Sequence, residues 1–296
     1  MERLIADELS GRHDQPHHTP HPPHRRTGTT GRRIADRLRA RGVAIRVASR
    51  SGTPAFDWDQ PDTWPDVLDG ATAAYIAYSP DIAMPGAADI VDRFARAAVD
   101  AGVEHLVLLA GRGEPEAEVA EQHVRDSGAR WTIVRASWFA QNFSEGMLLD
   151  ATRSGTIIMP ARDVGEPFVD VEDIADVAAT ALVEPGHDGR TYDVTGPRLL
   201  TFTDAAADLS AAAGRPITFV EVSPAEFVAE AVAEGLPIEL ADWIVTLCAV
   251  VLDGRNEHVG HGVQQALGRA PCDFRDFAAR AAAEGAWTTA DAAGAR

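Results

Sequence analysis

The sequence predicts a doubly wound parallel α/β sheet, followed by a smaller, mostly helical C-terminal lobe. Short apolar runs alternate with amphipathic patterns of about 10–15 residues as far as residue 150, and this alternation is typical of βαβ units. Two closely spaced glycines, Gly28 and Gly31, open the first amphipathic pattern. After residue 150 the patterns are mostly helical. We therefore expect a sheet domain over residues 27–150 and a second lobe over residues 151–296.

The segment TGTTGRR at residues 27–33 reads as the second half of a dinucleotide-binding turn. Gly28 and Gly31 keep the spacing of the last two glycines of that motif. The first of them lets the backbone approach a diphosphate, and the second lets the helix pack close to the sheet. The N-terminus of the helix then offers N–H groups to the phosphates.

The strand that should precede this turn is missing from its expected place. Residues 21–26 read HPPHRR, and neither proline can donate to the ladder of a central strand. We therefore expect the first strand to be damaged and residues 1–26 to form a disordered tail. One hypothesis is a reading-frame error, because suitable codons for residues 21–26 spell Thr-Leu-Leu-Thr-Gly-Gly when they are read one nucleotide later. The alternative is a natural His/Pro-rich tail on a degenerate domain.

The remaining elements follow from the spacing of apolar residues. In the sheet domain we expect a helix from Gly31 that ends at Gly42, and a short strand end at 56–58. The further strands are expected at 43–48, 73–77, 104–109 and 131–135, and the further helices at 63–68, 90–101 and 117–127. In the lobe we expect strands at 156–159 and 191–194, and helices at 171–182, 203–213, 223–234, 238–252 and 274–283.

Composition excludes several classes of protein. The 296 residues are 45% hydrophobic, which is enough for a full core, and their net charge of −18 argues against binding to nucleic acid. No apolar run is long enough to span a membrane, and no signal-peptide pattern opens the chain, so we expect a cytoplasmic protein. The two cysteines have neither disulfide nor metal spacing. The histidines 13, 17, 18, 21 and 24 have no acidic or cysteine partner at ligand spacing, so we expect no metal site.

Five segments together resemble one family. They are TGTTGRRIADRLRARG, AYIAYSPD, HLVLLAGRGE, VRDSGARWTIVRASWFAQNF and EPFVDVEDIADVA, in this order. They look like the NmrA-like branch of the atypical short-chain dehydrogenases. Within that branch, about residues 27–290 most resemble bacterial relatives of the festuclavine and agroclavine dehydrogenases of ergot alkaloid biosynthesis. The resemblance implies a Rossmann domain that binds NADP or NAD.

The resemblance also implies a cofactor site made of the glycine turn and the ends of the strands. The turn would hold the diphosphate, and the adenosine ribose would lie at the end of the second strand. An acidic residue there selects NAD, whereas this chain has Arg50, which favours NADP and leaves NAD as the alternative. The other interpretation of Arg50 is a solvated surface side chain. The expected cofactor-binding residues are Thr27, Gly28, Thr30, Gly31, Ser49, Arg50, Tyr78, Ser79, Pro80, Ala110 and Gly111.

The same resemblance implies a substrate site in the crevice between the sheet domain and the lobe. The expected substrate-binding residues are Arg112, Trp138, Phe139, Asn142 and Phe168. For the aromatic residues Trp138 and Phe139 the alternative is ordinary packing, whereas Asn142 is an amide in an apolar run and needs a partner. Asp170 and Asp173 are expected to cap the helix that begins there. His123 is the candidate catalytic residue, and a surface histidine is the alternative.

The residue inventory disfavours classical ketone reduction. That chemistry uses a Tyr-x-x-x-Lys pair in which the lysine lowers the pKa of the tyrosine, yet all 27 basic residues of this chain are arginine. We therefore expect an oxidoreductase that transfers hydride to an iminium, quinone or azo acceptor. The acidic chain suits a small cationic or aromatic substrate. The alternative is a non-catalytic NAD(P) sensor that binds a partner protein, and in either case we expect a monomer or homodimer.

Overall fold

The computed structural model describes residues 2–7 and 28–288, and it divides the chain into two compact units. Unit 1 comprises Met1–Arg135, Ile174–Asp193 and Gln265–Gly268. Unit 2 comprises Ala136–Asp173, Val194–Gln264 and Arg269–Arg296. The chain thus passes between the units several times rather than once near residue 150. Thr27, the five histidines at 13–24 and the segment 21–26 of the reading-frame hypothesis lie outside the described residues.

Unit 1 is built on a six-stranded sheet in the order β2-β1-β3-β4-β5-β7. The strands are β1 (Glu2–Asp7), β2 (Ile45–Ala48), β3 (Ala71–Ala77), β4 (His105–Gly111), β5 (Arg130–Ala136) and β7 (Arg190–Val194). β1 pairs in parallel with both β2 and β3, and β3 pairs in parallel with β4. The doubly wound α/β sheet expected from the sequence is therefore confirmed.

The prediction that the first strand is damaged is wrong for the described residues. Glu2–Asp7 forms β1, in register with β2 through Ile5 and Val47 and with β3 through Ile5 and Tyr75. Leu4 and Ile5 are completely buried. A parallel strand in the middle of a sheet is covered on both faces and needs a continuous apolar run, and the short run Leu-Ile-Ala supplies it. The central strand lies at the start of the chain, and residues 8–28 separate it from the first helix.

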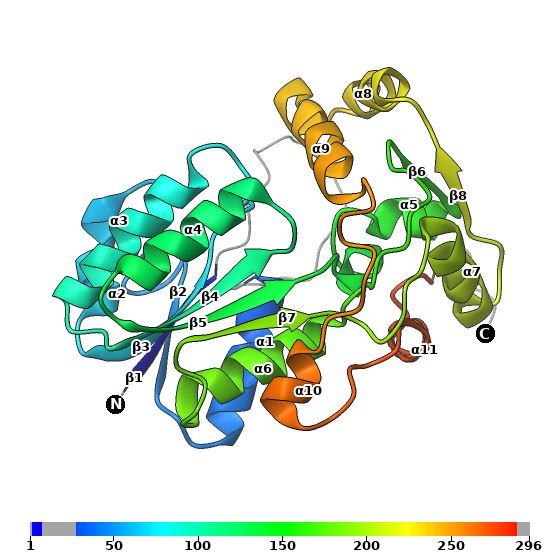
Figure 1. Cartoon of the computed structure of the whole chain (residues 1–296). Coiled ribbons are helices and arrows are strands. Elements are labelled where there is room, and N and C mark those ends of the chain that lie inside the picture. The colour runs from blue at the N-terminus through cyan, green and yellow to red at the C-terminus, as the bar shows by residue number, and fades with distance from the viewer. Residues whose placement is uncertain (1, 8–27, 289–296) are drawn as a thin grey trace. The chain divides into compact units, whose positions relative to one another are not determined.

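Helices cover both faces of this sheet. α1 (Thr29–Ala40) and α6 (Val171–Val183) lie on one face, and α3 (Ala87–Asp100) and α4 (Pro115–Asp126) lie on the other (Figure 1). The face of α1 expected to be buried, with Ile34, Ala35 and Leu38, is buried. An ion pair between Arg37 and Asp176 joins α1 to α6. A 3₁₀ turn (Pro61–Thr63) and α2 (Trp64–Leu68) complete the unit between β2 and β3.

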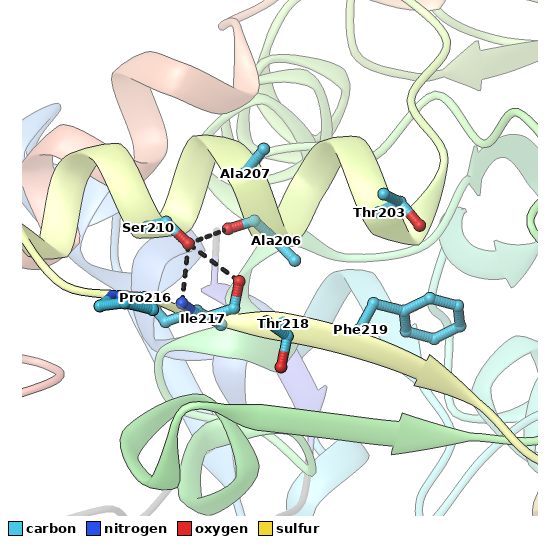
Figure 2. A pocket seen from close by; sticks show the side chains of 8 residues that line it. All are labelled: Thr203, Ala206, Ala207, Ser210, Pro216, Ile217, Thr218 and Phe219. Atoms are coloured by element: carbon cyan, nitrogen blue, oxygen red, sulfur yellow. Dashed lines mark hydrogen bonds between the residues drawn. The ribbon is translucent and has the colours of Figure 1, made fainter.

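Unit 2 is mostly helical, as the sequence predicts. Its elements are a 3₁₀ turn (Ala140–Phe143), α5 (Leu149–Ser154), β6 (Thr156–Met159), α7 (Phe202–Ala213), β8 (Thr218–Glu221), α8 (Pro224–Ala233), α9 (Ile238–Val251) and α11 (Phe274–Ala283). The short helix α10 (Gly262–Leu267) begins in unit 2 and ends in unit 1. β6 and β8 form a small parallel sheet. An open, mostly apolar groove lies between α7 and β8, where Ser210 bonds the backbone of Ile217 (Figure 2). In the described part of the chain no helix could cross a membrane.

Candidate functional site

The topology of unit 1 creates a switch point beside β1. From β1 the chain crosses to β2 through α1 on one face, whereas β3, on the other side of β1, leads into α3 on the opposite face (Figure 1). In open α/β sheets, ligands bind at the carboxyl ends of the strands where the connections diverge in this way. The described residues predicted to bind a cofactor all lie at this edge: Gly28, Thr30 and Gly31 at the start of α1, Ser49 and Arg50 after β2, Tyr78, Ser79 and Pro80 after β3, and Ala110 and Gly111 at the end of β4.

The N-terminus of α1 is suited to an anion. Gly28 occupies the N-cap position, and no side chain of the described residues caps the helix there. The first turn holds no acidic residue. The first N–H groups of a helix have no partner within the helix and carry a partial positive charge. Because glycine at the N-cap lets a ligand approach the backbone closely and no acidic residue stands in the first turn, this helix start fits a diphosphate.

The first turn of α1 is tied to the sheet by a buried hydrogen bond. The hydroxyl of Tyr75, in the middle of β3, donates to Oγ1 of Thr30 over 2.9 Å. The Tyr75 side chain is completely buried, and Thr30 is 3% exposed. Thr30 was predicted from the glycine turn, but nothing in the sequence pattern singled out Tyr75 as its partner.

The loop after β2 holds Arg50 on a compact turn. The carbonyl oxygen of Ser49 accepts hydrogen bonds from the N–H groups of Gly52 at 2.9 Å and Phe56 at 3.0 Å. A Cβ at Gly52 would lie 3.0 Å from that oxygen, so a larger residue would require the backbone of the turn to shift by a few tenths of an ångström. Ser49 is buried and Arg50 is exposed. A guanidinium is thus presented at the end of the second strand, where the sequence predicts recognition of the adenosine ribose.

The segment after β3 brings an aromatic ring and a carboxyl group to the same edge. The half-buried ring of Tyr78 lies 5.4 Å from the ring of Trp58, and burial raises the pKa of its hydroxyl, so that Tyr78 is neutral. Asp81 accepts a hydrogen bond from the N–H of Ala83 over 2.8 Å, and burial raises the pKa of its carboxyl. Sequence reasoning missed Asp81, although the run Ser-Pro-Asp after a strand is a signal for such a turn.

The end of β4 is closely packed by charged residues. A Cβ at Gly111 would overlap the carboxylate of Glu114, at 1.7 Å from Oε2, so a larger residue there would require the Glu114 side chain to move. Arg112, predicted to bind substrate, is 4% exposed, and its Nε lies 3.1 Å from Oδ1 of Asp193 on β7. The structure therefore places Arg112 in an ion pair within unit 1.

His123 lies away from this edge. It belongs to the last turn of α4, which starts at the carboxyl end of β4 and runs back across the sheet. Its Nδ1 is 3.4 Å from Oδ1 of Asp92 on α3. His123 therefore contacts Asp92 across the two outer helices α4 and α3, and we assign it no catalytic role. The described residues also contain no cluster of three histidine, cysteine or acidic side chains that could hold a metal ion.

In unit 2, the predicted substrate residues divide into surface and core. Trp138, Phe139 and Asn142 are half-buried around the 3₁₀ turn, and Nε1 of Trp138 finds no acceptor among the described residues. Phe168 instead lies inside the aromatic core of the unit, with its ring 5.2 Å from that of Phe202 and 5.5 Å from that of Phe274. Its ring is therefore a packing element in this structure.

The amide that finds a buried partner is Gln141, next to the predicted Asn142. Gln141 donates to Oδ1 of Asp170 over 2.7 Å and accepts from the N–H of Val171 over 2.8 Å. Asp170 also accepts from the N–H of Glu172, so it caps α6 as expected. Asp173 does not act as a cap. It accepts from the backbone N–H of Cys272 and pairs with Arg269, and burial raises the pKa of its carboxyl.

Comparison with known proteins places the chain among nucleotide-dependent reductases. No family model matches the sequence. The NAD(P)H azoreductase of Xenophilus azovorans is 36% identical over 265 residues, 85% of this chain and 87% of the relative. The agroclavine dehydrogenase of Claviceps fusiformis is 31% identical over 274 residues, 85% and 93% of the two chains.

Two solved structures share the fold. A Citrobacter sp. triphenylmethane reductase complexed with NADP(H) has a TM-score of 0.70 at 20% identity, covering 95% of this chain and all of its own. The NADPH complex of an Escherichia coli quinone oxidoreductase has a TM-score of 0.71 at 20% identity, covering 95% and 99%. With the glycine-containing turn at the switch point and two relatives above 30% identity, this chain belongs to the oxidoreductase family that includes the NAD(P)H azoreductase and the clavine dehydrogenases.

Proposed function

We propose that this protein is an NADP(H)-dependent oxidoreductase that transfers hydride to an acceptor which is already electrophilic, such as an iminium or a quinone-like molecule. The observation that carries the proposal is the glycine N-cap and acid-free first turn of α1 at the switch point of unit 1, with Arg50 at the end of the neighbouring strand. Two relatives support it: one is named as an NAD(P)H azoreductase and the other as an agroclavine dehydrogenase, and both names describe redox reactions.

In this proposal the chain holds the cofactor through unit 1. The N–H groups at the start of α1 bind the diphosphate, and the Thr30 hydroxyl adds a donor. The Arg50 guanidinium binds the 2′-phosphate that distinguishes NADP from NAD, because arginine offers a planar fork of donors to phosphate oxygens. The bound cofactor supplies the hydride. The chain's own contribution is to hold the two partners in a reactive orientation.

The tyrosines support an acceptor that needs no acid from the protein. Tyr75 is buried and bonded to Thr30, and Tyr192 on β7 is buried and lies 2.8 Å from Nδ1 of His187. Tyr78 is half-exposed at the cofactor edge, but no lysine exists anywhere in the chain to lower its pKa. Protonating a ketone oxygen would need such a pair. An iminium carbon accepts hydride without it.

The composition of the lobe supports a cationic, aromatic acceptor. Residues 216–254, which include β8, α8 and α9, contain seven acidic residues and no basic one. Half-exposed apolar side chains accompany these charges, among them Phe227, Leu240 and Trp243. A surface of this kind attracts a positively charged, apolar molecule.

Steady-state kinetics with a matched set of acceptors tests the proposal. Oxidation of NADPH would be followed with a cyclic iminium, a neutral quinone and a simple ketone. We expect turnover with the iminium and the quinone, and no turnover with the ketone. Efficient reduction of the ketone would contradict the proposed chemistry. Tight NADPH binding without turnover of any acceptor would favour the second candidate, a nucleotide-sensing regulator, which the absence of lysine also supports.

A further inference from the structure

Tyr75 occupies an unusual place for a polar side chain. β3 reads Ala-Thr-Ala-Ala-Tyr-Ile-Ala, and successive side chains of a strand point to opposite faces. Tyr75 therefore shares the α1 face with Ala73 and Ala77, whereas Ala74 and Ile76 belong to the hydrophobic core shared with α3 and α4. The two small neighbours leave room for one long side chain under the first turn of α1.

The phenol of Tyr75 reaches α1 at Thr30, the residue of the first turn that is proposed to donate to the diphosphate. Its hydroxyl donates to Oγ1 of Thr30 over 2.9 Å, and both groups are buried. A threonine hydroxyl carries one proton and two lone pairs. When one lone pair accepts the proton of Tyr75, the Thr30 proton must point to a different acceptor. In a buried chain of hydroxyls each donor also strengthens the next one.

We propose that Tyr75 is a positioning residue for the dinucleotide: it turns the Thr30 hydroxyl so that its proton is donated to a diphosphate oxygen at the start of α1. This inference rests on the proposed function, because it assumes that the diphosphate lies there. The phenol touches Thr30 and not the nucleotide. A side chain on the central strand β3 would in this way raise the affinity of the start of α1 for the diphosphate.

A matched tyrosine in the same unit separates this role from simple stabilisation. Tyr192 is also buried and its hydroxyl is also bonded, to Nδ1 of His187 at 2.8 Å. It lies on β7, three strands away from β3 and so about 14 Å across the sheet. Tyr75→Phe and Tyr192→Phe each remove one buried hydroxyl and keep the ring. Only the first is expected to change nucleotide binding.

The test measures binding of two probes by calorimetry to the full chain and its variants. NADPH contains the diphosphate, whereas adenosine 2′-phosphate contains only the adenosine half. We expect Tyr75→Phe to weaken NADPH binding by about threefold to tenfold and Thr30→Val by about tenfold or more, because hydrogen bonds to charged groups are the stronger ones. Neither variant should change the affinity for adenosine 2′-phosphate. Thr30→Ser should retain most of the NADPH affinity.

The double variant and the kinetics complete the test. Adding Tyr75→Phe to Thr30→Val should weaken NADPH binding no further, because the phenol acts through Thr30. In turnover, Tyr75→Phe should raise KM for NADPH and leave kcat unchanged. Equal NADPH affinity of Tyr75→Phe, Tyr192→Phe and the unchanged chain would overturn the proposal, as would a further loss in the double variant. A folded, unchanged chain that binds neither probe would instead contradict the proposed function.

Discussion

Replacing Leu4 with alanine tests whether the first residues of the chain form the central strand. Leu4 is 0% exposed and belongs to the same core cluster as Phe94, Leu106 and Ile133. Its neighbours in register are Arg46 on β2 and Ala74 on β3. The substitution removes one methine and two methyl carbons from a site enclosed on both sides by strands, so that the surroundings can collapse little.

The expected loss of stability is large. Leucine-to-alanine changes in rigid cores cost about 3–5 kcal/mol, which is a considerable part of the about 5–15 kcal/mol that stabilises a typical protein. Equilibrium unfolding in urea would measure it as a shift in midpoint with little change in slope. The control is Leu199→Ala, since Leu199 is 38% exposed and is expected to lose at most about 0.5 kcal/mol. Equal midpoints for the two variants would refute the assignment of β1.

Three further predictions concern other parts of the molecule. Burial lowers the pKa of His105 to about 4, and its Nε2 lies 3.0 Å from Oγ1 of Thr132. Below about pH 6.5 the unfolded chain binds a proton at this imidazole, whereas the folded chain does not until about pH 4. The free energy of unfolding should therefore fall by about 2 kcal/mol between pH 7 and 5. Urea unfolding at both pH values would measure this fall. If His105→Asn shows the same fall as the unchanged chain, the assignment to His105 is wrong. Arg280→Ala should cost about 3 kcal/mol because it leaves the buried carboxylate of Asp170 without its guanidinium, and a loss no greater than that of the exposed Arg275→Ala would count against this pairing. Trp138→Ala should raise KM for the acceptor and leave NADPH affinity unchanged; the reverse pattern would remove Trp138 from the acceptor site.

Much of the fold could be predicted because its elements are locally encoded. The α1 face of Ile34, Ala35 and Leu38 follows from helical spacing, and the observed burial agrees. The first strand could not be found in this way. Its apolar run is only three residues long, and the intervening residues 8–28 separate it from the turn to which it leads. Its place between β2 and β3 is a property of long-range pairing, which local patterns do not contain.

In the candidate site, the positions of residues at strand ends could be predicted from the sequence, whereas the directions of some side chains could not. Residues at strand ends could be predicted to share one edge because parallel strands bring their carboxyl ends together. The direction of a side chain in an irregular segment could not. The 3₁₀ turn at Ala140–Phe143 buries Gln141 and leaves Asn142 half-exposed, and the packing of four phenylalanines, not the sequence motif, decides that Phe168 lies in the core.

Calorimetric titration of the folded chain with NADPH and with NADH tests the central claim most directly. The claim is that the start of α1 binds a dinucleotide diphosphate and that Arg50 recognises the 2′-phosphate. We expect saturable binding of NADPH at one site, about tenfold or more tighter than that of NADH, and Arg50→Ala should remove this preference without abolishing the binding of NADH. A chain that unfolds cooperatively and yet releases no heat with either nucleotide would contradict the account.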